Sequence, residues 1–287
     1  MSVAQLAGGR VPTFARRLAV RDPLLIAAGI VMIGILGMAL FGPLLAPYDP
    51  NQLYVGPVAA PPSPAHWMGT DDLGRDILSR VLVGARPSVV GPILVVLASS
   101  LLGTLIAIVS AWFGGWVDGA SSRLIEVIFA IPGLVLAVLA VSMFGKGLIA
   151  PIVALSIAYI PIVSRLVRAS ARQELSKPYV AALRIQGVGS FAICFRHLVP
   201  ALLPAVLAQS TVGFGYAMLD LAAISYLGLG AQPPASDWGV MIAAGQPSLL
   251  VGAPEQSMFP AALVVVTVLA VNILGARVTT WAEGADR

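Results

Sequence analysis

The sequence predicts an all-α membrane protein with six transmembrane helices, and three observations support this fold class. Hydrophobic residues make up 58% of the 287 residues and charged residues only 10%, whereas about a quarter of a soluble protein is charged. The apolar residues gather in runs of about 20, the length that crosses roughly 30 Å of hydrocarbon as a helix. The basic residues lie between these runs and are distributed unevenly over the connections, as in multi-pass membrane proteins.

Six apolar spans follow one another along the chain, behind a basic N-terminal tail. The arginines of this tail resemble the start of a signal peptide, but the apolar run behind them is too long for one. In addition, "LAPYDP" places prolines where a cleavage site needs small residues. The first run is therefore expected to stay in the protein as a membrane helix. The expected spans are 24–46, 89–113, 124–144, 148–167, 201–223 and 258–281.

The distribution of positive charge predicts the orientation of these spans. Thirteen of the 17 Lys and Arg residues fall in the N-terminal tail, in alternate connections and near the C-terminus. Because basic connections stay on the cytoplasmic side, we expect both termini in the cytoplasm and the chain in the cell membrane. The expected divisions are a cytoplasmic tail 1–22, a first transmembrane helix 23–46, an extracytoplasmic loop 47–86, a core 87–281 with five spans and a cytoplasmic loop 165–200, and a cytoplasmic tail 282–287.

The two long outer connections have different compositions. Residues 43–64 contain seven prolines, so an extended connection is expected there. It leads into "GTDDLGRDILSRVLVGA", which predicts an interfacial helix over 70–84 with Thr70 as its N-cap, lying flat at the outer membrane surface. The connection 228–257 has no Lys or Arg and is rich in Gly and Pro. Its composition predicts turns packed over the mouth of the membrane domain.

The residues that carry enzyme chemistry are sparse and scattered. His66 and His197 lie on opposite sides of the membrane in this topology, so they cannot share a metal or a catalytic triad. Cys194 is the single cysteine, which excludes an intrachain disulfide. The Gly-Lys pair of "FGKGL" lacks the first glycine and the Ser or Thr of a phosphate-binding loop. We therefore expect no catalytic residue, no metal site and no cofactor in this chain, and no binding of nucleic acid.

The loop 165–200 combines a basic stripe with a short helix. Arg165, Arg168 and Arg172 continue the fourth span, and a solvated topology signal is enough to explain them. The helix is expected to stop near residue 177, because Pro178 disfavours a helical residue before it and suits the start of a new helix. Gly187 suits its C-terminal cap. An apolar face on such a helix, with no domain to bury it, indicates a surface for a partner.

The sequence "PYVAALRIQGVGSFAICFRHLVPALLPA" resembles the EAA-type coupling loop of ABC importer permeases, in which a short helix and a glycine precede a span that begins "H-x-x-P". Other stretches match the peptide-importer branch in the same order. They are "PLLAPYDP", "MGTDDLGRDILSRVLVGARPS", "GWVD", "SYLGLGAQPPASDWG" and "LAVNILG". Over residues 23–281 the chain is similar to the C-type permease subunit of dipeptide and oligopeptide ABC transporters, which implies a type I ABC importer permease fold.

This resemblance implies partners and contact residues. Similar permeases pair with a second, different permease subunit, two cytoplasmic ATP-binding subunits that hold ATP and Mg, and an extracytoplasmic peptide-binding protein. The glutamate of the family's loop would fall at Ala181, which departs from the pattern. The implied ATPase contacts on the coupling helix are Tyr179, Val180, Ala181, Ala182, Leu183, Arg184 and Gly187. The implied extracytoplasmic contacts are Gly69, Asp72, Arg75, Asp76, Pro233, Asp237 and Trp238.

Two other functions stay open. A related ABC permease for nickel or another small solute would share the same loop, because cargo selection in such systems lies mostly in the binding protein. A secondary transporter would need ionisable groups inside the membrane and an internal repeat. Only Glu126 and Asp220 approach that description, and for both we expect a structural pairing or an interfacial position rather than a transport role.

Overall fold

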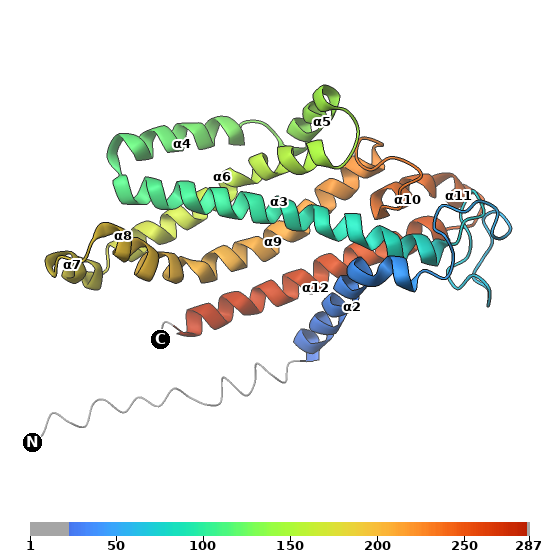
Figure 1. The fold of residues 1–287 in the computed structure, drawn as a ribbon, viewed down its shortest axis with the longest axis horizontal. Helices are drawn as coiled ribbons and strands as arrows, with labels where there is room; N and C mark the ends of the chain where they lie inside the picture. Colours follow the sequence, from blue (N-terminus) through green and yellow to red (C-terminus); the bar gives the residue numbers. More distant parts are fainter. Residues whose placement is uncertain (1–22, 286–287) are drawn as a thin grey trace, which may run out of the picture.

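The computed structural model describes residues 23–285, with side chains described as far as residue 277, and it is helical throughout its regular parts (Figure 1). The tail 1–22 and the last two residues lie outside the described part. The helices are α2 (Pro23–Leu45), α3 (Ile77–Phe113), α4 (Gly115–Phe129), α5 (Gly133–Phe144), α6 (Ile149–Leu175), α7 (Pro178–Ile185), α8 (Ser190–Ile193), η2 (Cys194–Leu198), α9 (Val199–Tyr226), α10 (Trp238–Ala244), α11 (Gln246–Leu250) and α12 (Glu255–Ala285).

The predicted spans correspond to long helices of the structure. Among the described residues, five helices are long and apolar enough to cross a membrane, and the bent pair α4 and α5 raises this number to six if it counts as one span. In Figure 1, α3, α6, α9 and α12 run along the long axis of the molecule, and α2 lies beside α12 and α3. The six-span, all-α prediction is thus confirmed. The backbone of α12 stays helical to Ala285 and so includes part of the expected C-terminal tail.

The third predicted span, 124–144, is wrong as a single straight helix. The chain forms α4 and α5 there, and their axes differ by 77°. The break falls at Ile131 and Pro132, because a proline disfavours a helical residue before it and cannot donate the hydrogen bond of a helix interior. Pro132 instead stands just before the first residue of α5, Gly133.

The expected interfacial helix 70–84 is also wrong at its start and in its isolation. The helix begins at Ile77 with Asp76 as its N-cap, and it continues without interruption as α3 to Phe113. Gly74 has a φ of +69°, which is incompatible with a helix through that point. Thr70 caps no helix and instead accepts a hydrogen bond from the backbone NH of Ala60. The stretch is the first part of a 37-residue helix rather than a separate helix flat on the membrane.

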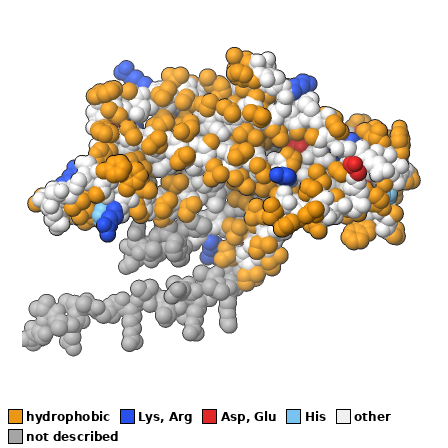
Figure 2. Space-filling model, in the orientation of Figure 1, with side chains coloured by type: hydrophobic (Ala, Val, Ile, Leu, Met, Phe, Trp, Pro, Cys, Tyr) orange, Lys and Arg blue, Asp and Glu red, His pale blue; other side chains and the backbone are white. Residues whose placement is uncertain are grey.

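The interior of the bundle is mostly apolar and forms one large and one smaller cluster of buried side chains. Each of the five long helices contributes buried side chains to one cluster, for example Ile35, Val89, Leu155, Ile224 and Val264. Figure 2 shows that hydrophobic side chains are spread over the visible face of the long helices, with Lys and Arg as isolated spots. This arrangement suits a bundle whose surroundings are hydrocarbon rather than water.

Two assemblies of short elements lie at opposite ends of the long axis (Figure 1). One end carries α7, α8 and η2, and we call it the α7 end. The other end carries residues 46–76 together with residues 227–254, including α10 and α11, and we call it the cap. The long helices α3, α6 and α9 connect the two.

Candidate functional site

The short helix α7 has the boundaries that the sequence predicts. Pro178 occupies its first position, and Gly187 follows its last turn with a φ of +78°. The NH of Gly187 donates to the carbonyl of Arg184 (3.1 Å), and the NH of Val188 donates to the carbonyl of Leu183 (3.0 Å). These two bonds form a Schellman motif, which stops the helix and turns the chain back toward α9.

The surface of α7 is largely exposed in this chain. Ala181, Ala182 and Arg184 are exposed, Leu183 is half-buried, and Ile185 is 88% exposed. Val180 is 2% exposed and faces the interior of the chain. The helix therefore presents apolar and small side chains outward from one buried anchor.

The N-terminal side of α7 is tied to the end of α6. The Tyr179 hydroxyl donates a hydrogen bond to Glu174 (2.8 Å), and Lys177 forms an ion pair with the same carboxylate (2.7 Å). Burial, with the hydrogen bond to Glu174, raises the pKa of Tyr179 to about 12. The phenol is therefore neutral, and a donor, throughout the physiological pH range.

The basic stripe of α6 also contacts other parts of the chain, although Arg165 and Arg172 remain exposed. Arg168 and Arg172 both form ion pairs with Asp118 on α4, the first at 3.0 Å. Asp118 also accepts a hydrogen bond from Ser110 on α3. The Arg165 guanidinium lies over the Phe129 ring at 4.4 Å. The stripe thus fastens α6 to α4 and α3 beside the α7 end.

A second cation–π contact reaches α7 itself. The Arg184 guanidinium lies 5.3 Å from the centre of the Trp112 ring, at the end of α3. Tyr179 and His197 of η2 have ring centres 6.2 Å apart. The helix is therefore braced by contacts to α3, α6 and η2 at once.

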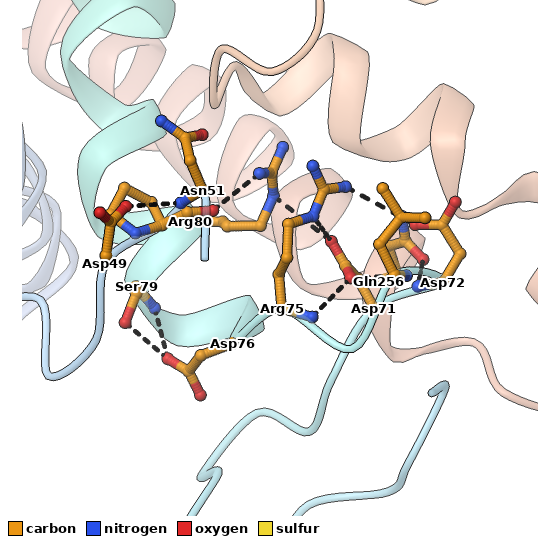
Figure 3. A network of polar contacts seen from close by, with 11 residues as sticks. Asp49, Asn51, Asp71, Asp72, Arg75, Asp76, Ser79, Arg80 and Gln256 are labelled. Carbon is orange, nitrogen blue, oxygen red and sulfur yellow. Dashed lines mark hydrogen bonds and ion pairs between the residues drawn. The ribbon is translucent and has the colours of Figure 1, made fainter. Parts of the chain in front are cut away.

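A largely buried ionic network holds the start of α3 in the cap (Figure 3). Arg75 donates to Asp71 at 2.6 Å, and Arg80 lies 3.6 Å from the same carboxylate. Asp72 forms two hydrogen bonds with Gln256 of α12. The backbone NH of Asp72 donates to the Gln256 amide oxygen (3.0 Å), and the Gln256 amide NH₂ donates to the Asp72 carboxylate (2.8 Å). The network therefore joins the beginning of α3 to the beginning of α12.

Asp76 is the N-cap of α3 and stands directly before its first residue, Ile77. Its carboxylate accepts from the NH (2.8 Å) and hydroxyl (2.7 Å) of Ser79, and it contacts Nδ1 of His66 at 2.9 Å. The bond from the Ser79 NH satisfies an otherwise unpaired NH group of the first helical turn. The contact with His66 attaches the preceding loop to the helix.

The other half of the cap is clamped onto α3. Asp237 caps α10 by accepting from the NH of Val240 (3.2 Å), and it accepts a second bond from the hydroxyl of Ser88 (3.0 Å). Trp238 is fully buried, and its indole NH donates to the carbonyl of Val81 (3.0 Å). Burial raises the pKa of the Asp237 carboxyl group, and these hydrogen bonds oppose that shift.

A cleft of about 290 Å³ opens between α3, α6 and α9 in the middle of the bundle. Its polar lining includes Asp220, which accepts a hydrogen bond from the Tyr159 hydroxyl at 2.8 Å. Ser100 and Ser210 face each other across α3 and α9, with their hydroxyl oxygens 2.8 Å apart. The rest of the wall is mostly apolar.

The sequence as a whole matches a known family of transport subunits. Residues 99–284 match the binding-protein-dependent transport system inner membrane component. The chain belongs to this family of ABC importer permeases. Residues 14–62 also match the N-terminal transmembrane domain of oligopeptide transport permease C. The permease is thus a multi-pass membrane subunit that acts with other ABC subunits, and it is a transport component rather than an enzyme.

Relatives and solved structures agree with this membership. The permease is 35% identical over 256 residues to the glutathione transport system permease protein GsiD of Pectobacterium atrosepticum, covering 89% of this chain and 85% of the relative. GsiD of Escherichia coli O1:K1 is also 35% identical, over 89% of this chain and 84% of the relative.

Two solved transporters show the fold alone, because their sequence identity is low. One is a crystal structure of an amino acid ABC transporter with histidines, with a TM-score of 0.55 and 21% identity over 70% of this chain and 94% of that one. The other is the inward-facing MetNI methionine ABC transporter, with a TM-score of 0.57 and 18% identity over 71% and 96%. The type I importer permease fold is therefore confirmed.

The permease does not expose all the contact residues that the resemblance implies. Arg75, Asp76, Asp237 and Trp238 are buried within the cap, so their side chains hold its shape and are not available to a partner. Gly69 has a φ of +79° and lies against the carbonyl of Ala60, which makes it a turn residue. Of the expected outer contacts, the side chains of Asp72 and Pro233 are exposed.

Sequence reasoning missed two features of the permease. Ile185 is the most exposed large hydrophobic residue of α7. Its position in the last turn before the Gly187 cap could have indicated this. The cleft was also missed, although Gln209, Tyr216 and Asp220 stand on one face of an otherwise apolar span. Such a polar line within a membrane helix indicates a cavity or a partner rather than lipid.

Proposed function

We propose that this permease imports small peptides as one of two different permease subunits. Its assembly would contain two ATP-binding subunits that bind the ATP and Mg, an extracytoplasmic binding protein, and no cofactor on this chain. The observation that carries the proposal is α7, an exposed apolar helix whose direction is fixed by the Gly187 cap and by contacts to three other elements. A helix of this kind suits insertion into a groove on a partner.

The orientation follows from charge. We propose that both termini and the α7 end lie in the cytoplasm, where the ATP-binding subunits are, because basic connections stay on that side. The cap would then lie outside, where Asp72 and Pro233 can meet the binding protein or the second permease.

The motion can be carried by the long helices. When the ATP-binding subunits close, a displaced α7 pulls on α3 through Arg184 and Trp112, and on α6 through Glu174. Both helices line the cleft, so their movement opens and closes it in an alternating-access cycle.

The peptide cargo is supported by two comparisons. The match to the oligopeptide permease domain covers the first helix, and the GsiD relatives are named for glutathione, which is itself a small peptide. The alternative cargo, nickel or another small solute, is represented by Ni²⁺ in the uptake experiment.

The test is uptake by the assembled transporter in proteoliposomes. The permease is co-purified with its partner subunits, and radiolabelled glutathione, trialanine and Ni²⁺ are offered with the binding protein and ATP. We expect ATP-dependent uptake of at least one peptide and none of Ni²⁺, with an ATPase variant that cannot hydrolyse ATP as the control. Uptake of Ni²⁺ without either peptide would replace the proposed cargo, and uptake that ignores ATP would overturn the importer assignment.

A further inference from the structure

The cleft between α3, α6 and α9 has a polar wall on α9. Gln209, Gly213, Tyr216 and Asp220 follow one another on α9 at intervals of four, three and four residues, so they share one helix face. At about 1.5 Å per residue this face extends over roughly 16 Å.

Asp220 is the charged group of this wall. Its carboxylate accepts a hydrogen bond from Tyr159, and among the described residues no Lys, Arg or His lies within ion-pair distance of it. A carboxylate offers about four acceptor positions. Most of its capacity to accept hydrogen bonds is therefore not used by the described side chains.

The wall is accessible from one side. Tyr216 is 63% exposed, and Asp220, Tyr159 and Gln209 are half-buried. Acids retained inside membrane helices face a bundle interior or a water-filled cavity and usually mark a pathway, because a charge facing hydrocarbon costs about 2.5–3.5 kcal/mol. The half-buried Asp220 therefore indicates a solvated passage beside α9 rather than contact with lipid.

We propose that this cleft is part of the translocation path and that Asp220 binds the positively charged amino group of the passing peptide. The proposal rests on the peptide cargo proposed above. An ammonium group donates three hydrogen bonds and matches a carboxylate with neighbouring hydroxyl and aromatic groups, which here are Tyr159 and Tyr216. The cleft has a volume of about 290 Å³, and a longer peptide would extend out of its open side.

The chemistry of the wall favours an amine over a divalent transition metal. Nickel is typically held by several ligands that include imidazole nitrogen, whereas the described lining of the cleft offers one carboxylate among phenol, amide and serine groups and no histidine. Tyr159 is a positioning residue here, because its hydroxyl orients the Asp220 carboxylate from α6.

The experiment compares two peptides that differ in the amino group alone. Uptake of trialanine and of N-acetyl-trialanine is measured in proteoliposomes that contain the whole transporter, with each peptide at a concentration that saturates the binding protein. For Asp220→Asn we expect about a tenfold loss of trialanine uptake, which corresponds to about 1.4 kcal/mol, and no change in N-acetyl-trialanine uptake. Asp220→Glu should restore at least half of the trialanine uptake, and Tyr159→Phe should lower it two- to threefold.

Two further readings separate this role from a structural one. The purified Asp220→Asn complex should retain its partner subunits, and its ATPase activity should still be stimulated within twofold of the unaltered transporter. Loss of the second permease subunit would mean that Asp220 pairs with a cation of that subunit, and this would overturn the proposal. An equal loss of uptake for both peptides, or no loss for either, would also overturn it. If the unaltered transporter imports neither peptide, the proposed function itself fails, and this inference fails with it.

Discussion

Gly187 sets the direction in which the chain leaves α7. Its φ of +78° lies in the region that a side chain with a Cβ rarely adopts, although a Cβ built there would meet nothing within 4 Å. Glycine is therefore required at position 187 for its backbone conformation and not for lack of space. Two residues later, Gly189 has a φ of −60° and equally open surroundings, so it serves as a control position where a side chain causes no backbone strain.

We predict that Gly187→Val impairs transport and that Gly189→Val does not. A non-glycine residue in the left-handed region costs roughly 1–2 kcal/mol, and relaxing that strain would redirect α7 away from its present angle. Uptake and substrate-stimulated ATP hydrolysis should fall at least fivefold for the first variant and stay within twofold for the second. Equal behaviour of the two glycine variants would show that the Schellman cap has no part in coupling.

Ile185 tests the surface of the same helix. Its side chain is 88% exposed, so Ile185→Asp should leave the fold of this chain intact while placing a charge in the proposed groove, where an unpaired buried charge costs several kcal/mol. We expect loss of the ATP-binding subunits from an affinity-purified complex. Gln173→Asp, an exposed substitution on α6 with the same added charge, should retain them. Retention of the ATP-binding subunits by Ile185→Asp would remove α7 as the docking element.

At the scale of elements, α4 and α6 are joined by one acid and two arginines. Asp118 accepts from Arg168 and Arg172, and these contacts lie beside the end of α3 through Ser110. These side chains thus connect three helices, α3, α4 and α6, near α7. Since the side chain of Arg172 is half exposed, only part of its attraction to Asp118 escapes screening by solvent.

We predict that Asp118→Asn lowers the stability of the purified transporter by about 1 kcal/mol, the upper range for a partly exposed ion pair. Thermal inactivation of ATPase activity would show it as a shift of a few degrees. Arg168→Gln should cost less, because Asp118 keeps its ion pair with Arg172 in that variant. The double variant should be no worse than Asp118→Asn alone, because the Asp118–Arg168 pair is already lost there. Additive losses would mean that the two residues act independently.

The elements differ in how far the sequence alone determines them. The length of the apolar runs was enough for the six spans, and Pro178 with Gly187 was enough for α7. The bend between α4 and α5 was signalled by Pro132, but the continuous hydrophobicity around it favoured a single span. The start of α3 was misplaced, because both Thr70 and Asp76 are suitable caps and only the backbone at Gly74 decides between them.

The contacts between distant segments could not be predicted from one sequence. Asp118 and Arg168 are 50 positions apart, and Trp238 bonds Val81 across 157 positions. No local pattern connects such pairs, since their meeting depends on how whole helices pack. For the same reason Arg75 and Trp238 were expected at a partner surface and are buried instead.

At the scale of the whole molecule, the two ends of the bundle differ in character. The cap is built from buried ion pairs and capped turns, while the α7 end exposes a short apolar helix. The proposed orientation puts these ends on opposite sides of the membrane. Two alanines at exposed positions, Ala235 in the cap and Ala181 on α7, make a matched pair for testing it.

We predict that Ala235→Cys is labelled by a membrane-impermeant thiol reagent in intact cells, and that Ala181→Cys is labelled only after the membrane is opened. Both substitutions are made with Cys194→Ser, which removes the native thiol. Positive charge on the proposed cytoplasmic connections is the basis of this expectation. The reverse labelling pattern would invert the topology and detach α7 from the cytoplasmic subunits.

The unbroken course of α3 has a thermodynamic consequence. Its 37 residues, about 55 Å of helix, begin in the cap and end beside Trp112, where Arg184 of α7 rests. If a binding protein on the cap and a nucleotide-closed ATPase on α7 each favour one position of this helix, their effects on one another must be equal. An ATPase state that weakens the binding protein tenfold is itself destabilised tenfold, about 1.4 kcal/mol, when the binding protein docks. The binding protein on one side of the membrane and the nucleotide state on the other would then be coupled by one and the same factor in both directions.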